Sequence, residues 1–247
     1  MALTSLNKSD EAPFQYGHLS LKDILAVRDK RLAQTIDTVL LYNGRGFTRF
    51  NTGMESTSST GYGVAKYDNE AIPEGFRSQS GKNYTHAPLF WLSVIYLNYA
   101  EACAELGNIT QDDLDKSINL LKDRAGLPHL NPIVGFSDPA NNHGVSDLIW
   151  EIRRERRCEL MFDNDNRYWD LIRWHQLDKL DTTKYPDIIL GANVANDMDG
   201  CEANKVGKYI DGSKDGSRIY DKKHYLYPIP TGQIALNPQL APNNPGW

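Results

Sequence analysis

Cysteine is scarce in this sequence, and the few cysteines show no metal-binding arrangement. The 247 residues include three, Cys103, Cys158 and Cys201. None forms a C-x-x-C pair, and none has a histidine at the spacing that zinc sites use. The odd number leaves at least one thiol unpaired. The cysteines therefore predict no metal site, and Cys103 and Cys158, which fall within helical patterns, are expected to be small core residues.

Long apolar runs and a recognisable export signal are also missing. No stretch approaches the run of about twenty apolar residues that a membrane-spanning helix needs. Residues 1–8 lack the positively charged and then apolar regions of a signal peptide. Taken alone, these absences indicate a cytoplasmic protein, unless Met1 is an internal start.

An excess of positive charge is absent too. The chain has 27 basic and 32 acidic side chains, which gives a net charge of −5. Binding to phosphates needs a dense basic face, and none is visible along the sequence. We therefore expect no nucleic acid among the partners of this protein.

Motifs of catalysis and cofactor binding are absent as well. The sequence contains no nucleophile elbow, phosphate loop, dinucleotide fingerprint or metalloprotease helix. Its six histidines share no spacing that metal ligands use. Because these chemistries need particular residue types at particular spacings, we predict no catalytic residue, no metal and no cofactor, and hence a protein that is not an enzyme.

Helical patterns are the clearest feature that is present. Apolar residues recur at helical spacing over 89–106 and again over 112–125. Gly107 and Gly126 follow these two segments, and glycine is common just past the end of a helix. Two helices of this length around a short turn predict a helical hairpin of the tetratricopeptide kind.

The remaining segments complete a mainly α prediction. Further helices are expected over 145–162 and 167–180, so that the helical core covers 89–180. We predict a single domain over 1–247.

Long loops are predicted on both sides of this core. Residues 43–88 are rich in Gly, Ser, Thr and Asn, and a loop of that length is usually functional or mobile. A short strand is expected within 60–67. The tail, 181–247, is expected to be loop with at most one hairpin, around 211–216.

The densest charge cluster lies at 151–159. One hypothesis makes Glu155 and Glu159 a pair of catalytic carboxylates, as in glycosidases. Residues four apart lie on one face of a helix, however, so both would approach a bond from the same side. The interleaved arginines would also keep both ionised, whereas an acid catalyst needs a raised pKa. An ion-pair lattice that ties this helix to its neighbours is the favoured interpretation.

Alternating acidic and amide side chains at 163–166 raise the alternative of a calcium site. A helix-loop-helix calcium loop carries Gly at its sixth position and Glu at its twelfth. In this chain those positions hold Tyr168 and Trp174. The segment, like 197–200, is therefore interpreted as a solvated turn.

Several segments together resemble the SusD/RagB family, in the family's order and over nearly the whole chain. The most specific are E-R-R-C-E-L at 155–160, R-Y-W-D-L-I-R-W at 167–174 and Y-L-Y-P-I-P at 225–230. Weaker matches lie at 29–32, 35–36, 60–67, 96–102 and 237–247. Because family members are typically about twice as long, the sequence is similar to their C-terminal half alone.

This resemblance implies a mainly α, SusD-like fold and a function in nutrient capture. Such proteins are non-catalytic, bind oligo- or polysaccharides or other polymers, and act with a SusC-like TonB-dependent outer-membrane transporter. They are lipoproteins of the outer membrane, exposed at the cell surface, and the membrane attachment would be a lipidated N-terminus absent from this chain. The alternative is a helical-repeat scaffold that binds only other proteins and no saccharide.

The residues of the two hallmark segments are expected to be structural. We expect Arg156, Glu159, Arg167, Asp170 and Trp174 to hold the third and fourth helices together. Glu155 and Arg167 are each expected to belong to a partly buried ion pair, so that replacing either lowers stability.

Ligand contacts are expected from the loops instead, because sugars need exposed aromatic rings flanked by amides and guanidinium groups. The long loop opens with that composition. The predicted ligand-binding residues are Tyr42, Arg45, Phe47, Arg49, Phe50, Asn51 and Tyr62. The alternative, that Phe47 and Phe50 only anchor the loop, stays open.

Overall fold

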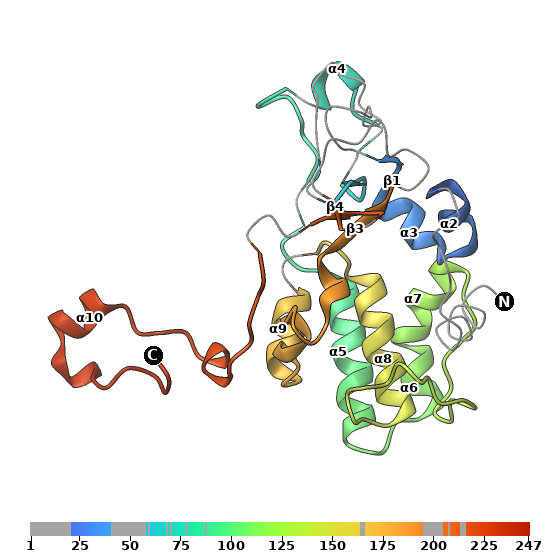
Figure 1. Cartoon of the computed structure of the whole chain (residues 1–247). Coiled ribbons are helices and arrows are strands. Elements are labelled where there is room, and N and C mark those ends of the chain that lie inside the picture. Colours follow the sequence, from blue (N-terminus) through green and yellow to red (C-terminus); the bar gives the residue numbers. More distant parts are fainter. Residues whose placement is uncertain are drawn as a thin grey trace.

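The computed structural model shows a body of helices, a small β region and a C-terminal arm that extends away from the body (Figure 1). It describes residues 21–40, 58, 60–67, 69, 71–77, 79–86, 88–163, 166–194, 205–206, 208–212 and 216–247. The predicted mainly α fold is confirmed. Within these residues, no helix is both long enough and apolar enough to cross a membrane.

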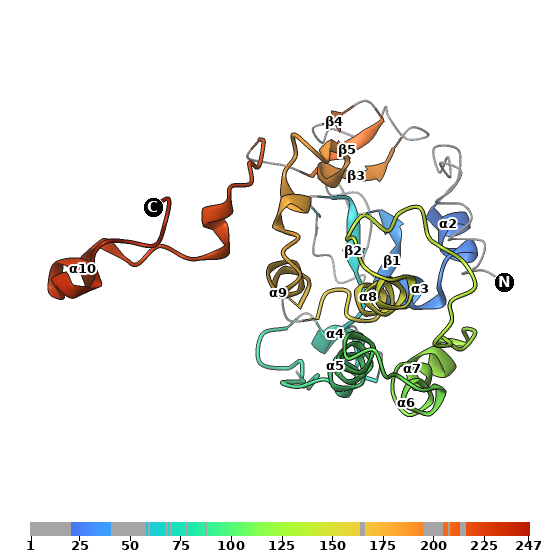
Figure 2. The ribbon, with the colours of Figure 1, turned by 90° about the horizontal axis from the view of Figure 1, so that it is seen from below.

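The body is built around three helices. These are α5 (Leu92–Glu105), α8 (Asp147–Glu159) and α9 (Asn166–Arg173). Figure 2 shows all three close to end-on, with α6 (Gln111–Asp115) and α7 (Ile118–Ala125) beside α5. The main core lies between α5, α7 and α8, and its fully buried side chains are Leu97, Ala100, Leu114, Ile118 and Ile152.

The predicted helical hairpin is present, with one difference. Helix α5 is followed by Gly107 and α7 ends at Gly126, and both glycines have the positive φ that their residue type allows at low cost (72° and 69°). The second helix is interrupted at Ser117, whose hydroxyl donates a hydrogen bond to the carbonyl of Asp113 at 2.5 Å. Such a bond from a serine side chain competes with the regular helical pattern, which divides the segment into α6 and α7.

The third and fourth predicted helices are also found. Helix α8 begins after Ser146, whose hydroxyl accepts a hydrogen bond from the amide of Ile149, as an N-cap does. The fourth is shorter than predicted, because His175 adopts a left-handed φ of 54° and ends the helical path. A separate 3₁₀ turn, η2 (Leu177–Leu180), follows it.

Short helices and strands make up the rest. The N-terminal part holds α2 (Leu21–Val27), α3 (Lys30–Thr35) and β1 (Ile36–Leu40), and β1 pairs with β2 (Tyr62–Val64), the strand expected within 60–67. A second sheet has the order β3 (Leu190–Asn193), β5 (Tyr209–Asp211), β4 (Lys205–Val206). The remaining elements are α4 (Glu74–Arg77), η3 (Pro186–Ile189), η5 (Lys222–Tyr225), α10 (Thr231–Leu236) and η6 (Pro238–Leu240).

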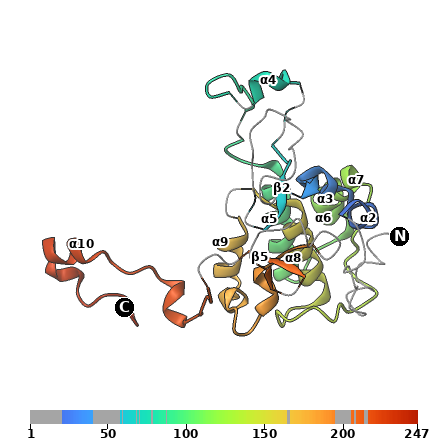
Figure 3. The ribbon, with the colours of Figure 1, turned by 45° about the horizontal axis from the view of Figure 1, so that its top comes forward.

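These small elements correct part of the tail prediction. The hairpin of the tail is formed by β4 and β5, earlier in the chain than the predicted 211–216, and it pairs further with β3. A small core of Ala192, Val194 and Ile210 fixes this sheet. The segment around α4 projects from the body on the side of β2 (Figure 3).

A buried ion-pair network joins the three main helices, as predicted for 151–159. Glu101 of α5 accepts hydrogen bonds from Arg153 of α8 at 3.3 Å, from Arg173 of α9 at 2.5 Å and from the indole of Trp174 at 2.6 Å. Arg156 donates to Asp170 at 2.7 Å and so links α8 to α9 a second time. The roles predicted for Arg156 and Asp170 are therefore confirmed, and Trp174 contacts the third helix through the guanidinium of Arg153, which lies 4.6 Å from its ring centroid.

A second part of the network ties α8 to the N-terminal helices. Glu155 is almost fully buried and pairs with Arg31 of α3 at 2.5 Å, and with Lys122 of α7 at 3.6 Å. Glu159 pairs with Arg31 at 2.9 Å and with Arg124 at 2.5 Å. The prediction for Glu155 is confirmed, whereas Glu159 links α8 to α3 and α7 rather than to α9.

We expect Glu101 to be the most sensitive residue of this network. The substitution Glu101→Gln places an amide between three donors and leaves guanidinium charge uncompensated in a buried site, so it should lower the free energy of unfolding by about 3–5 kcal/mol. The matched control is Glu105→Gln, one turn further along α5, where a half-exposed carboxylate contacts the same Arg153 at 3.4 Å. It should cost less than about 1 kcal/mol. Urea denaturation measures both, and equal losses would contradict the prediction.

Candidate functional site

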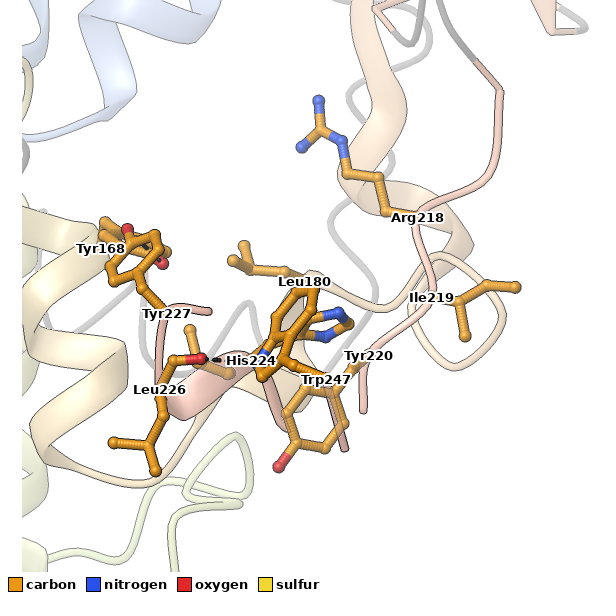
Figure 4. A pocket seen from close by; sticks show the side chains of 10 residues that line it. Tyr168, Leu180, Arg218, Ile219, Tyr220, His224, Leu226, Tyr227 and Trp247 are labelled. Carbon is orange, nitrogen blue, oxygen red and sulfur yellow. Dashed lines mark hydrogen bonds between the residues drawn. The ribbon is translucent and has the colours of Figure 1, made fainter. Parts of the chain in front are cut away.

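An aromatic cavity lies where the C-terminal arm meets the body of helices. Its volume is about 280 Å³. Figure 4 shows Tyr168 and Tyr227 at one end, Arg218 and Ile219 at the other, and His224 and Trp247 between them. The complete lining consists of Tyr168, Leu177, Leu180, Arg218, Ile219, Tyr220, His224, Leu226, Tyr227 and Trp247. We call this site the aromatic cavity.

Hydrogen bonds from α9, η2 and the following loop hold the arm against the body. The hydroxyl groups of Tyr168 and Tyr227 lie 3.0 Å apart, and the amide of Leu177 donates to the hydroxyl of Tyr225 at 3.2 Å. Further along, the amide of Thr182 donates to the carbonyl of Arg218 at 3.0 Å. These bonds join residues between 36 and 59 positions apart in the sequence, so the cavity exists only in the folded chain.

Trp247 is held at the centre of the cavity although it is the last residue. Its indole N–H donates to the carbonyls of Leu226 at 2.9 Å and Lys223 at 3.2 Å. Its ring lies edge-on to the ring of His224, with the centroids 5.8 Å apart, and the ammonium of Lys223 lies over it at 4.4 Å. Nearly half of the Trp247 surface, 46%, remains exposed and available to a ligand.

The tyrosines supply neutral hydroxyl groups. Burial, followed by the hydrogen bond with Tyr225, raises the pKa of Tyr220 to about 12. The hydrogen bond with Tyr227, followed by burial, raises the pKa of Tyr168. Both phenols are therefore protonated near neutral pH and can donate as well as accept hydrogen bonds.

The lining of the aromatic cavity is aromatic and polar and contains no acidic side chain among its described residues. It combines aromatic faces, phenol hydroxyls and the guanidinium of Arg218, but no carboxylate is found among the described residues that line it. Glu155 and Glu159, the alternative catalytic pair, face Arg31 and other cations instead. The interpretation of 151–159 as an ion-pair lattice is thus confirmed.

Asp163, the first residue of the segment considered as a calcium loop, is engaged in contacts within the protein. Asp163 is buried, pairs with the ammonium of Lys66 at 2.7 Å and accepts a hydrogen bond from the hydroxyl of Tyr67 at 2.9 Å. These contacts tie the end of α8 to the loop after β2. Within the described part of the chain, no three His, Cys, Asp or Glu side chains converge into a metal site.

Of the ligand-binding residues predicted from the sequence, Tyr62 is the one within the described part of the chain, and it does not line this cavity. Tyr62 is half-buried on β2 and packs against the small core around Ile210, and its burial raises the pKa of its hydroxyl. The other six lie outside the described residues: Tyr42, Arg45, Phe47, Arg49, Phe50 and Asn51. Their role in binding stays a prediction.

The residues of the aromatic cavity are not among the candidates selected from the sequence, although the sequence marks some of them. The aromatic run at 225–227 and Trp247 were noted only as family hallmarks. The sequence does not predict the contact between Tyr168 and Tyr227, because this contact depends on how the start of the arm packs against α9.

The comparisons with known proteins agree with this mainly helical class of fold. The chain belongs to the SusD family, whose model matches residues 24–247. A SusD-like carbohydrate-binding protein from Bacteroides fragilis is similar in structure, with 23% identity and a TM-score of 0.58 over 94% of this chain. A second SusD-like protein from the same organism has 24% identity and a TM-score of 0.53 over 91%. No curated protein matches the chain.

These two solved structures support the fold assignment. The matched region covers 45% of the first structure and 40% of the second, so the chain spans less than half of their length. The fold expected from the resemblance is therefore confirmed for the described residues.

We expect Trp247 to order the arm around η5. Replacing it by alanine, Trp247→Ala, removes two indole hydrogen bonds and the contact with His224, so amide hydrogen exchange over 222–226 should become at least tenfold faster. Exchange in α8 should not change. The control is Leu236→Ala on α10, a residue of the same arm whose side chain is 81% exposed. If the control accelerates exchange at 222–226 as much, Trp247 does not have this role.

Proposed function

We propose that this chain is a non-catalytic glycan-binding part of a nutrient-uptake system, and that the aromatic cavity holds sugar units. The aromatic cavity carries this proposal, because a sugar ring offers a flat C–H face to an aromatic ring and hydroxyl groups to polar side chains. Membership of the SusD family supports it, as does the description of one similar structure as a carbohydrate-binding protein.

The geometry of the cavity indicates how a sugar would bind. Trp247 and Tyr227, exposed by 46% and 63%, offer ring surfaces at the rim. Tyr168, Tyr220 and Arg218 add hydrogen-bonding groups around them. A volume of about 280 Å³ lies just below the range of small-molecule sites, roughly 300–1,000 Å³, so the cavity suits a short stretch of a longer glycan.

We propose a non-catalytic function because of the side chains that line the aromatic cavity. Glycoside hydrolysis needs two carboxyl groups on opposite sides of the scissile bond. The described lining of the aromatic cavity has none. We therefore propose capture and delivery of a glycan rather than its cleavage.

Location and partner are proposed from the family. We propose that the whole protein is a lipoprotein of the outer membrane, exposed at the cell surface, and that it passes its ligand to a SusC-like TonB-dependent transporter. The aromatic cavity would hold the glycan until the transporter accepts it.

A protein-binding scaffold is the second candidate function, and one observation favours it. Large apolar side chains contact solvent just before α5 and at its first residue, with Phe90 exposed by 92%, Leu89 by 81% and Leu92 by 63%. Surfaces of this kind are frequent at protein contacts. In a pure scaffold, however, no saccharide would bind.

Titration against oligosaccharides decides between the two functions. We expect isothermal titration to detect binding of at least one member of a panel of plant and host glycans. Tyr227→Ala should weaken that binding about tenfold, equivalent to roughly 1.4 kcal/mol for the loss of one aromatic contact. Trp247→Ala should weaken it at least as much, because it also loosens residues 222–226 of the lining. The control is Tyr84→Ala, a tyrosine 62% exposed and outside the lining, which should bind as the wild type does.

The same titration tests the residues predicted from the loop. Tyr42, Phe47, Phe50 and Tyr62 are each replaced by alanine. If these variants lose affinity while Tyr227→Ala and Trp247→Ala do not, the glycan binds at the loop and the aromatic cavity is not the site. Absence of binding to every glycan, together with capture of a protein partner through α5, would favour the scaffold.

A further inference from the structure

A second hollow adjoins the aromatic cavity and differs from it in charge. It measures about 620 Å³ and lies between α8, α9, η2, η3 and the loop before α8. Leu180 lines both this hollow and the aromatic cavity. Five cationic residues contribute to its walls, Arg153, Arg154, Arg157, Arg167 and Lys179, against two carboxylates, Asp138 and Asp187. We call it the cationic hollow.

Most of the charged groups in the cationic hollow are already engaged. Arg153 donates to Glu101 at 3.3 Å, and Arg154 pairs with Glu151. Asp138 accepts hydrogen bonds from the indole of Trp150 at 2.9 Å and from the amide of Ala140 at 2.8 Å. These groups therefore form the wall and do not need a ligand.

Arg157 and Arg167 are different. In the part of the chain that the structure describes, neither guanidinium makes a hydrogen bond or an ion pair, and the guanidinium of Arg167 lies over the ring of Trp174, 5.9 Å from its centroid. The predicted ion pair of Arg167 is therefore wrong. Burial, followed by the positive charge of Arg157, lowers the pKa of Arg167 to about 10. A half-buried cation beside a like charge is costly, and a bound anion would remove that cost.

Both arginines also line a third hollow, of about 640 Å³, between α8 and α9. Arg157, Arg167, Leu171 and Leu180 are common to the two linings, while Tyr168 connects this third hollow to the aromatic cavity. The unpaired guanidinium groups thus line two hollows that both share Leu180 with the aromatic cavity, so a ligand that extends from the aromatic cavity past Leu180 reaches them.

His143 adds an unsatisfied polar atom to the cationic hollow. Its Nδ1 is buried and has no hydrogen-bond partner among the described residues. Its ring lies edge-on to Trp150, with the centroids 5.0 Å apart. Burial, followed by the charges of Arg153 and Arg167, lowers its pKa to about 4, so the ring is neutral near pH 7 and can donate from one nitrogen.

We propose that Arg157 and Arg167 bind the anionic group, a carboxylate or a sulfate ester, of an acidic glycan whose neighbouring sugars occupy the aromatic cavity. Guanidinium groups suit this task because they offer paired N–H donors that match carboxylate and sulfate oxygens. The rings of Trp150 and Tyr185 give the cationic hollow the aromatic surface that a sugar ring needs. This inference rests on the proposed glycan-binding function and names the class of its ligand.

The test compares charged glycans with uncharged counterparts in isothermal titrations. One arm uses oligogalacturonides and their methyl esters, in which an uncharged ester replaces each carboxylate on the same sugar backbone. The other uses sulfated galactan oligosaccharides and their desulfated forms. We expect the charged member of at least one pair to bind about tenfold more tightly or better, with an affinity that falls as salt is added. The arm that shows this preference identifies the anion.

Variants then assign the preference to the two arginines. Arg157→Gln and Arg167→Gln should each remove most of the preference for the charged member and leave the affinity for the uncharged one unchanged. Lys208→Gln, an exposed cation on the turn between β4 and β5, is the matched control and should keep the preference. Because no ion pair is lost, Arg167→Gln should unfold at the same or a higher temperature, whereas a structural arginine would lower it.

The outcomes separate this inference from the proposed function. If charged and uncharged glycans bind equally well through Tyr227 and Trp247, the anion site is wrong and the glycan-binding function stands. Binding of inorganic sulfate as tightly as any sulfated oligosaccharide would also overturn the proposed acidic-glycan site, because the sugar rings would then contribute no affinity. If no glycan binds, both fail.

Discussion

The carboxylate of Glu101 is the contact on which the arrangement of the main helices depends. It is nearly buried, at 3% exposure, and accepts hydrogen bonds from α8, from α9 and from Trp174 directly after α9. A charge that is removed from water stays stable only when its partners are held in place, so the bond geometry of Glu101 restricts the position of all three helices. Helix α9 in turn carries Tyr168 and Arg167, the residues that link the network to the surface.

The position of α9 explains why the two proposed binding surfaces, one aromatic and one cationic, lie side by side. Consecutive residues of a helix point about 100° apart, so Arg167 and Tyr168 reach different sides of it. Arg167 lines the cationic hollow, and Tyr168 lines the aromatic cavity. One short helix, fixed by buried ion pairs, therefore offers both a positive charge and an aromatic ring to the same neighbourhood. This combination is what a glycan with charged groups requires.

Local sequence patterns predicted the helices well and their interruptions poorly. The apolar periodicity of α5 and α8 was sufficient to find them, because each buries one continuous face in the core. The breaks at Ser117 and His175 were missed. Ser117 departs from the helix because its hydroxyl bonds to the carbonyl of Asp113, and His175 because it adopts a φ that non-glycine residues seldom take. The spacing of apolar residues predicts neither the hydrogen bond of the Ser117 hydroxyl nor the φ of His175.

The sequence by itself determined the mainly α fold, the family and, Arg157 excepted, the structural nature of the charges at 151–159, since periodicity, glycine stops and charge density are local properties. Tertiary structure alone decided which charges pair. Glu155 meets Arg31, 124 positions away, whereas Arg167 meets no carboxylate among the described residues. It also brought Tyr168, Tyr220 and Trp247 into one cavity. The physical reason is that ion pairs and cavities depend on the distances between packed elements, and those distances are set by the core and not by the spacing of residues along the chain.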